Sequence, residues 1–429
     1  MSEGGSAVST TRLVSPLLCL ALLASACSSE PLTAPAPSPK AAAVAGCESF
    51  DATPCNTMEH DCQVSRFELA ACLRQVAPGT LPKVTYMTEQ QYIDYIDASW
   101  EGWKPPETNH FEIAMTWLGL AEHGSFDYVS PDPAEVAGWF GTYRWRNKDL
   151  LIIDHGRPAD DAASNVELVA AWIRALRDRD INIGIWTTAV AVFDVDSNWG
   201  ADAMYFGEAR FFSNRYRAAV DGVAPNVVDE AALINRGIVE DVAWIRSQPS
   251  TYVATNNRFA YNFGARAAYL AWRRNGVDAV NALYQDKMLT HQLMASETEE
   301  GPRPTAKYHT LPRASEEWEY SPVTTAIGAW GLFLSLSRHL DQDAAWALSL
   351  SWRGEQLFVH KGLEPNEHET ALIWQLEMAD EASAAALEDV LESYPKQPQV
   401  RRGGTFVTLA ISSNETPLDW AFVDETSGG

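Results

Sequence analysis

The spacing of apolar residues changes near residue 350, and this change constrains the fold more than any other feature of the sequence. Before it, apolar residues recur every three or four positions in most segments, the period of a helix packed on a core. The helix predicted over 164–177 has its apolar stripe at Val166, Val169, Ala170, Ile173 and Leu176. After residue 350, the stretches GEQLFVHK and TALIWQLEM alternate as half-buried strands do.

Local patterns also predict the other elements. A strand at 83–87 precedes a helix that opens with the capping box Thr88-Glu89-Gln90-Gln91. Segments 136–143 and 150–153, joined by a turn at 146–149, are typical of a β-hairpin. Further helices are predicted over 111–120, 201–219, 228–247, 263–274, 277–285 and 322–339. A final helix (381–393) and strand (404–412) complete the expected α+β fold: a mainly helical core with an N-terminal β-hairpin and a small C-terminal β-β-α-β sheet.

The first 26 residues are typical of a targeting segment. A polar start with Arg12 leads into an apolar stretch, and the small residues 24–26 precede Cys27, as in a lipoprotein signal peptide. The stretch is about 14 residues long, whereas a membrane-spanning helix needs roughly 20. We therefore predict export, a lipid on Cys27 and an anchor on the periplasmic or outer side of a bacterial membrane. A plain secretory signal cut near Ala26 remains the alternative.

Composition divides the rest of the chain. Residues 27–46 are rich in Pro, Ala and Ser and form a spacer, since such a segment buries too little apolar area to fold. We expect a Cys-rich, disulfide-stapled segment at 47–80 and a mainly helical domain at 81–350. A C-terminal α+β subdomain at 351–415 and a tail at 416–429 follow.

Four cysteines lie close together at the start of the folded part: Cys47, Cys55, Cys62 and Cys72. In an exported protein an even number of cysteines favours two disulfides, and three pairings are open. A zinc site is the alternative, but these cysteines lack the two-residue spacing typical of zinc ligands.

The charge excludes one class of partner. With 57 acidic and 32 basic residues the net charge is −25, and such a surface repels nucleic acid. The sequence has no Gly-rich phosphate loop, no GxSxG and no HExxH. Residues 194–198 begin like a calcium loop, but Trp199 stands at its Gly position and Tyr205 at its Glu position, so we expect an ordinary acidic loop.

The order of several motifs resembles a group of predicted bacterial zinc metallopeptidases. That family has an "LGL" helix, a "vaGfYd…lyvv" hairpin, a helix with "HELxHALQDQ", an "EGeA" helix, a "Y..G" segment and a C-terminal "GWrGD" sheet. The resemblance covers roughly residues 84–393 and implies a gluzincin-like architecture. The matching stretches are Leu118-Gly119-Leu120, Val136-Ala137-Gly138-Trp139-Phe140, Val166-Glu167-Leu168-Val169-Ala170, Phe206-Gly207-Glu208-Ala209, Tyr261-Asn262-Phe263-Gly264-Ala265, residues 276–284 and Ser351-Trp352-Arg353-Gly354-Glu355.

The metal ligands of that family are replaced here. The two His positions hold Val166 and Ala170, and the third-ligand Glu position holds Phe206. Only the position of the general base, Glu167, is retained. Val and Ala have no lone pair to give a metal, and without zinc the pKa of water stays near 15.7 instead of falling to about 7. Hydrolysis by the family mechanism is therefore not expected, and Glu167 is interpreted as a solvated or hydrogen-bonded carboxylate.

Three functions follow from the resemblance and the anchor. The first is a catalytically inactive metallopeptidase-like lipoprotein that binds a peptide or an envelope protein, with no cofactor. The second is an active zinc-dependent peptidase with a rebuilt metal site at His155, Glu167 and Glu208, and the third is a structural envelope lipoprotein.

Overall fold

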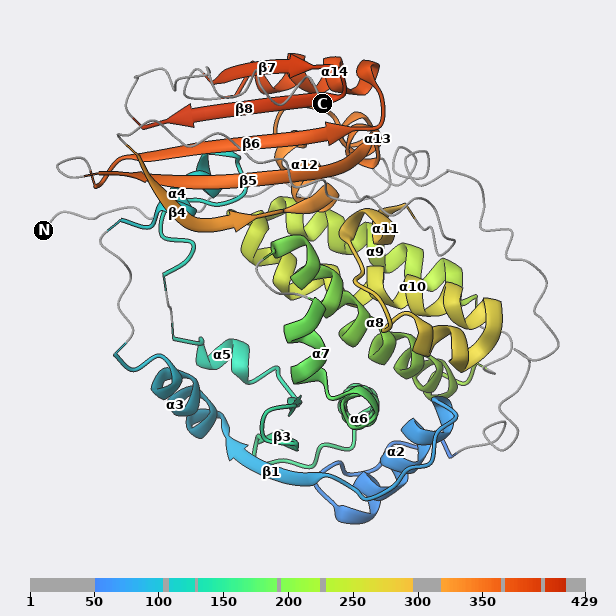
Figure 1. Ribbon diagram of the computed structural model, residues 1–429. Coiled ribbons are helices and arrows are strands. Elements are labelled where there is room, and N and C mark those ends of the chain that lie inside the picture. Colours follow the sequence, from blue (N-terminus) through green and yellow to red (C-terminus); the bar gives the residue numbers. More distant parts are fainter. Residues whose placement is uncertain are drawn as a thin grey trace, which may run out of the picture. The chain divides into compact units, whose positions relative to one another are not determined.

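The computed structural model describes residues 51–102, 108–127, 130–190, 194–223, 229–295, 318–363, 367–394 and 398–413 (Figure 1). The predicted signal peptide, the lipidation site Cys27, the spacer, Cys47 and the tail lie outside these residues.

The N-terminal elements form a three-stranded sheet with short helices beside it. The helices are α2 (His60–Leu73), α3 (Glu89–Ser99), α4 (His110–Trp117) and α5 (Pro133–Val136). The strands β1 (Lys83–Thr88), β2 (Gly141–Arg144) and β3 (Asp149–Asp154) have the order β1-β3-β2. The hairpin β2–β3 is antiparallel as predicted. The strand predicted at 83–87 is confirmed as β1, and it pairs in parallel with β3, a pairing that we did not predict.

Two local predictions at this end have clear outcomes. The capping box is confirmed, because the Thr88 side chain accepts from the Gln91 amide and the Gln91 side chain accepts from the Thr88 amide. The first half of the predicted hairpin strand is wrong, because Val136 ends α5 and the strand begins only at Gly141. Gly141 is required there, since a Cβ would lie 2.1 Å from the carbonyl oxygen of Leu151.

Six helices form the middle of the chain, green to yellow in Figure 1: α6 (Ala162–Ile181), α7 (Ile183–Val190), α8 (Val195–Val220), α9 (Glu230–Ser247), α10 (Thr251–Ala282) and α11 (Thr290–Met294). Asp161 caps α6 by accepting from the Ser164 amide at 2.8 Å. The helix predicted at 263–274 falls within α10, and the one predicted at 277–285 ends there at Ala282; between them the backbone leaves helical geometry at Asn275 and Gly276.

The predicted acidic loop at 194–198 is instead the start of α8. Asp194 is the N-cap and accepts from the Ser197 amide at 2.7 Å, and Asp196 lies buried in the first turn. A carboxylate at an N-cap satisfies an amide that has no partner within the helix, which explains why an acidic run begins a helix here.

Helices α8 and α10 pack closely at two glycines. A Cβ on Gly264 would lie 1.7 Å from the carbonyl oxygen of Ala203, and a Cβ on Gly207 would lie 2.1 Å from the carbonyl carbon of Gly264. Both glycines belong to stretches that carry the family resemblance. Their missing side chains let the two helix backbones approach each other.

The C-terminal sheet has five antiparallel strands in the order β4-β5-β6-β8-β7, orange to red in Figure 1. They are β4 (Trp318–Thr325), β5 (Trp352–Gly362), β6 (Thr370–Met378), β7 (Gln399–Gly403) and β8 (Phe406–Ser412), with helices α12 (Gly328–Leu336), α13 (Gln342–Leu350) and α14 (Glu381–Leu391). The four elements of the predicted β-β-α-β run are present as β5, β6, α14 and β8, and the sheet has two further strands, β4 and β7, that we did not predict. The helix predicted from residue 322 begins only at Gly328, because residues 323–325 pair with β5.

The fold class is α+β, as predicted. One large apolar cluster extends from α2 through the helices to the C-terminal sheet, and it buries Trp172, Trp330, Trp352 and Trp374 almost completely. Within the described ranges, no helix combines the length and the apolar character needed to cross a membrane.

Candidate functional site

The helix α6 carries three of the residues that the resemblance singled out, and they have different surroundings. Val166 is buried in the apolar core, and Ala170 is half-buried against it. Glu167 is exposed. Phe206 of α8 lies beside the same helix, since the Arg174 guanidinium is 5.2 Å from its ring centroid. The positions that would hold zinc in the family therefore carry only carbon side chains.

The side chain of Glu167 lines a cavity of about 700 Å³, which we call the α6 cavity. Segments 137–141 and 155–164 form most of its wall, together with Met58, Ile153, Glu167 and Tyr261 of α10. Trp139 and Tyr261 are exposed by 37% and 40%, so two aromatic rings are accessible there. The cavity thus combines charged and aromatic groups.

Three polar groups of this wall have no hydrogen-bond or ion-pair partner among the described residues: the Glu167 carboxylate, the Arg157 guanidinium and the Tyr261 hydroxyl. Burial raises the pKa of Tyr261; Arg174 opposes this rise and Glu167 adds to it. The phenol therefore keeps its proton at neutral pH and can donate it to a bound group.

His155 also lines the α6 cavity, but both of its ring nitrogens are engaged. Nδ1 lies 2.6 Å from a Glu89 carboxylate oxygen, and Nε2 lies 2.6 Å from the Trp139 carbonyl oxygen. Neither nitrogen has a lone pair free for a metal in this arrangement. His155 instead links the Trp139 backbone to Glu89 of α3 through its two ring nitrogens.

Glu208 lies in a buried cluster of charges instead of the cavity. Its carboxylate accepts from Arg74 Nε at 2.8 Å, from Arg177 Nε at 2.7 Å and from the Tyr284 hydroxyl at 2.6 Å. Burial alone would raise the pKa of Glu208, but the guanidinium groups of Arg177 and Arg74 lower it to about 2. Glu208 is thus a permanent anion that holds α2, α6 and α8 together.

The rebuilt zinc site at His155, Glu167 and Glu208, the basis of the second function considered above, is not assembled. His155 and Glu167 share the α6 cavity, whereas Glu208 is enclosed by its two arginines. Within the part of the chain that the structure describes, no three His, Cys, Asp or Glu residues are grouped so as to hold a metal ion. The residues at these positions do not fit the zinc that the resemblance implies.

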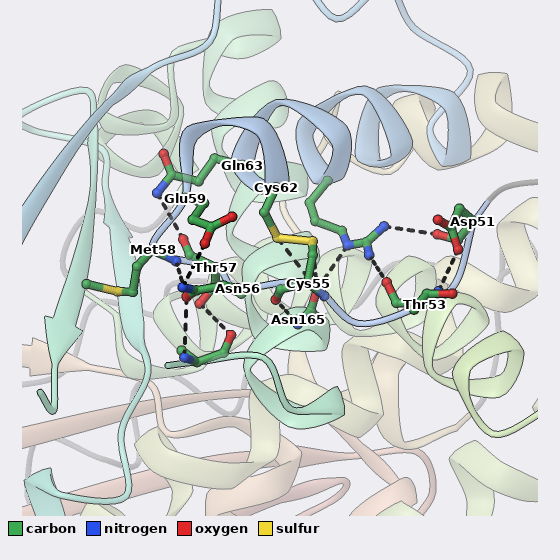
Figure 2. The surroundings of a disulfide bond; sticks show 12 residues. Asp51, Thr53, Cys55, Asn56, Thr57, Met58, Glu59, Cys62, Gln63 and Asn165 are labelled. Carbon is green, nitrogen blue, oxygen red and sulfur yellow. Dashed lines mark hydrogen bonds between the residues drawn. A yellow bond between two sulfur atoms is a disulfide. The ribbon is translucent and has the colours of Figure 1, made fainter. Parts of the chain in front are cut away.

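A disulfide joins Cys55 to Cys62 of α2, close to Asn165 of α6 (Figure 2). The buried Asn165 of α6 donates to the Cys55 carbonyl oxygen at 2.8 Å and accepts from the Cys55 amide at 3.2 Å. The Thr57 amide donates to the carbonyl oxygen of Ala159, a residue of the cavity wall. The pairing that the sequence left open is therefore partly resolved. Cys72 is disulfide-bonded as well.

A second cavity of about 380 Å³ adjoins the other end of β2. Its wall comes from residues 142–147 of the β2–β3 hairpin, from α7 and from α8, and includes Phe206. Phe206 thus faces this second cavity, while its ring contacts Tyr261 of the α6 cavity at 5.6 Å between centroids.

Sequence reasoning found Glu167 but missed Arg157, Trp139 and Tyr261 as partners around it. Trp139 and Tyr261 do stand in stretches that carry the resemblance, so their order along the chain was the available signal. Comparison of the chain with family models, with curated proteins and with solved structures finds no match.

Proposed function

We propose that this protein is an exported lipoprotein, anchored through Cys27, that binds a peptide segment of an envelope partner in the α6 cavity without cleaving it. One observation carries the proposal. Glu167, Arg157 and Tyr261 come from three separate segments, face one cavity and lack hydrogen-bond partners among the described residues. Polar groups that converge in a concave site are typical of ligand recognition.

The cavity suits a peptide because donors, acceptors and aromatic rings occur together in it. A volume of about 700 Å³ holds several residues of an extended chain. Gly141 of β2 borders the cavity, and β2 is an edge strand of its sheet, with only β3 paired to it among the described strands. A peptide laid along this edge would gain backbone hydrogen bonds by strand addition.

The side chains at the former ligand positions support binding over hydrolysis. Val166 and Ala170 offer no donor atom to a metal, and Glu208 is neutralised by two arginines. Glu167 alone cannot make a strong nucleophile of water, whose pKa is near 15.7. We therefore assign Glu167 a role in recognition.

The anchor sets where the partner must lie. The composition of residues 27–46 predicts a spacer, and a random coil of that length would have a root-mean-square length of about 25 Å, so the cavity would stay close to the membrane surface. The disulfide between Cys55 and Cys62 supports an oxidising compartment outside the cytoplasm.

An array of peptides derived from envelope proteins tests this function. We expect the wild-type chain to retain a defined subset and the Trp139→Ala variant to bind it at least about tenfold more weakly, as for an aromatic anchor in a pocket. Trp100→Ala is the matched control, since Trp100 is 43% exposed and lies outside the cavity wall. Equal binding by both variants, or no retained peptide, would contradict the proposal.

A further inference from the structure

We propose that the α6 cavity selects a cationic group of the bound peptide, a lysine or arginine side chain or a free amino terminus, through the Glu167 carboxylate. This inference rests on the proposed peptide-binding function and specifies its ligand. It assigns to the one retained residue of the family's catalytic motif a new role as the anion of a recognition site.

The charges of the cavity wall favour a cation near α6. Glu167 and Asp161 are the two carboxylates, and both stand on the first turns of α6 or at its cap. Asp161 stays ionised, because hydrogen bonds from Ser164 lower its pKa. His155 already has a partner within the protein, since its Nδ1 lies 2.6 Å from a Glu89 carboxylate oxygen. Arg157 alone adds an unbalanced positive charge, and it has no ion pair with Glu167.

The missing pair between Arg157 and Glu167 leaves both groups available to a ligand. An ammonium or guanidinium group can bind Glu167 as a charge-assisted hydrogen bond. Arg157 can meanwhile bind a carbonyl oxygen or a carboxylate of the same peptide. The two residues together would fix the direction in which the peptide lies.

Aromatic rings complete a site for an organic cation. Trp139 packs edge-on against Tyr92, with 5.6 Å between ring centroids, and Tyr261 packs against Phe206. These contacts hold both rings at the cavity while leaving them accessible. Rings in this position attract cations through their quadrupoles, and they also cover the methylene stem of a lysine or arginine.

The charge of the whole chain acts in the same direction. A net charge of −25 attracts basic peptides over a Debye length of about 8 Å and raises their association rate. This attraction is general, whereas the attraction by Glu167 is local. The experiment must therefore separate the two.

The test uses synthetic peptides that are acetylated, amidated and identical except at one position, which is lysine, arginine, norleucine or glutamate. We expect the lysine and arginine peptides to bind about tenfold more tightly than norleucine, the effect of one charge-assisted hydrogen bond. Glu167→Gln should reduce this ratio to about twofold or less. Glu68→Gln, an exposed residue of α2 that changes the net charge equally, should keep it.

Each remaining outcome has a defined meaning. If norleucine peptides with a free amino terminus bind about tenfold more tightly than their acetylated forms, the terminus supplies the cation at Glu167, and the inference stands. Equal binding of the acetylated lysine, acetylated norleucine and free-terminus norleucine peptides overturns the cation selection but leaves peptide binding intact. An unchanged preference for the cationic peptide in Glu167→Gln overturns it in the same way. If none of the peptides binds, the proposed function fails together with the inference.

Discussion

Two buried carboxyl groups, Asp196 and Glu355, meet at the start of α12 and make the stability of the protein depend on pH. Glu355 accepts from the Gly328 amide at 2.7 Å, from the Ile327 amide and from the Trp374 indole at 2.9 Å. Gly328 has a φ of +70°, and a Cβ there would lie 2.0 Å from an Asp196 carboxylate oxygen. No basic side chain forms an ion pair with either group among the described residues.

Burial, together with a neighbouring carboxylate, raises the pKa of Glu355 to about 8 and that of Asp196 to about 7. A raised pKa in the folded state means that the folded state binds the proton more tightly. Below pH 4.5 the Glu355 carboxyl group is protonated in both the folded and the unfolded state and does not change the free energy of unfolding. As the pH rises from 4.5 to about 8, the unfolded state ionises first and stability falls, by roughly 3–5 kcal/mol in total.

The variant Glu355→Gln should remove the contribution of Glu355 to this dependence and leave that of Asp196. The amide cannot accept from the Trp374 indole through its nitrogen, so the variant should be less stable at pH 5 by about 1 kcal/mol. At pH 9 it should be the more stable protein, because the wild type then has an ionised carboxylate in the core.

Urea unfolding between pH 5 and pH 9 measures this difference, and Glu68→Gln serves as the control with an exposed carboxyl group. We predict that the wild-type and Glu355→Gln stability curves cross at about pH 6, because the wild type loses about 1.4 kcal/mol of stability per pH unit above pH 4.5. Parallel curves would refute the reasoning, since they would mean that Glu355 has the same pKa in the folded and unfolded states.

Three further perturbations have definite expected outcomes. Glu208→Gln should cost about 3–5 kcal/mol in chemical denaturation, because it leaves the buried Arg177 charge without its partner; a loss below 1 kcal/mol would show that the cluster is solvated. Gly264→Ala should lower the melting temperature by at least about 5 °C, since its Cβ would overlap the α8 backbone; an unchanged melting temperature would contradict the close helix packing. Replacing Cys55 and Cys62 by serine should cost about 2–3 kcal/mol, the value for a loop this short; urea unfolding with no change would show that the disulfide is not structural.

Local patterns in the sequence predicted local structure well. The capping box at Thr88 and the antiparallel pairing of β2 with β3 depend on residues a few positions apart, and both are present. The parallel pairing of β1 with β3 joins segments more than 60 residues apart along the chain. Nothing in the alternation of either strand specifies that partner, so the sequence could not predict it.

At the candidate site, too, local features could be predicted from the sequence and long-range contacts could not. That Val166 and Ala170 cannot bind a metal was visible in the sequence, because their side chains have no donor atoms. The burial of Glu208 between two arginines could not be predicted from the sequence. Its partner Arg74 is 134 positions away, and only the packing of α2 on α6 and α8 brings them together. Arg157, Tyr261 and Glu167 likewise lie in three separate segments of the chain, and only the folded structure brings them to one cavity.

Hydrogen–deuterium exchange with a peptide retained by the array tests the central claim most directly, because it reports where the peptide lies. The account predicts slower exchange at residues 137–144 and at 155–167, which border the α6 cavity and the edge of β2. The Trp139→Ala variant should lose this protection. Protection confined to other segments, or protection that Trp139→Ala leaves unchanged, would show that the α6 cavity is not the binding site.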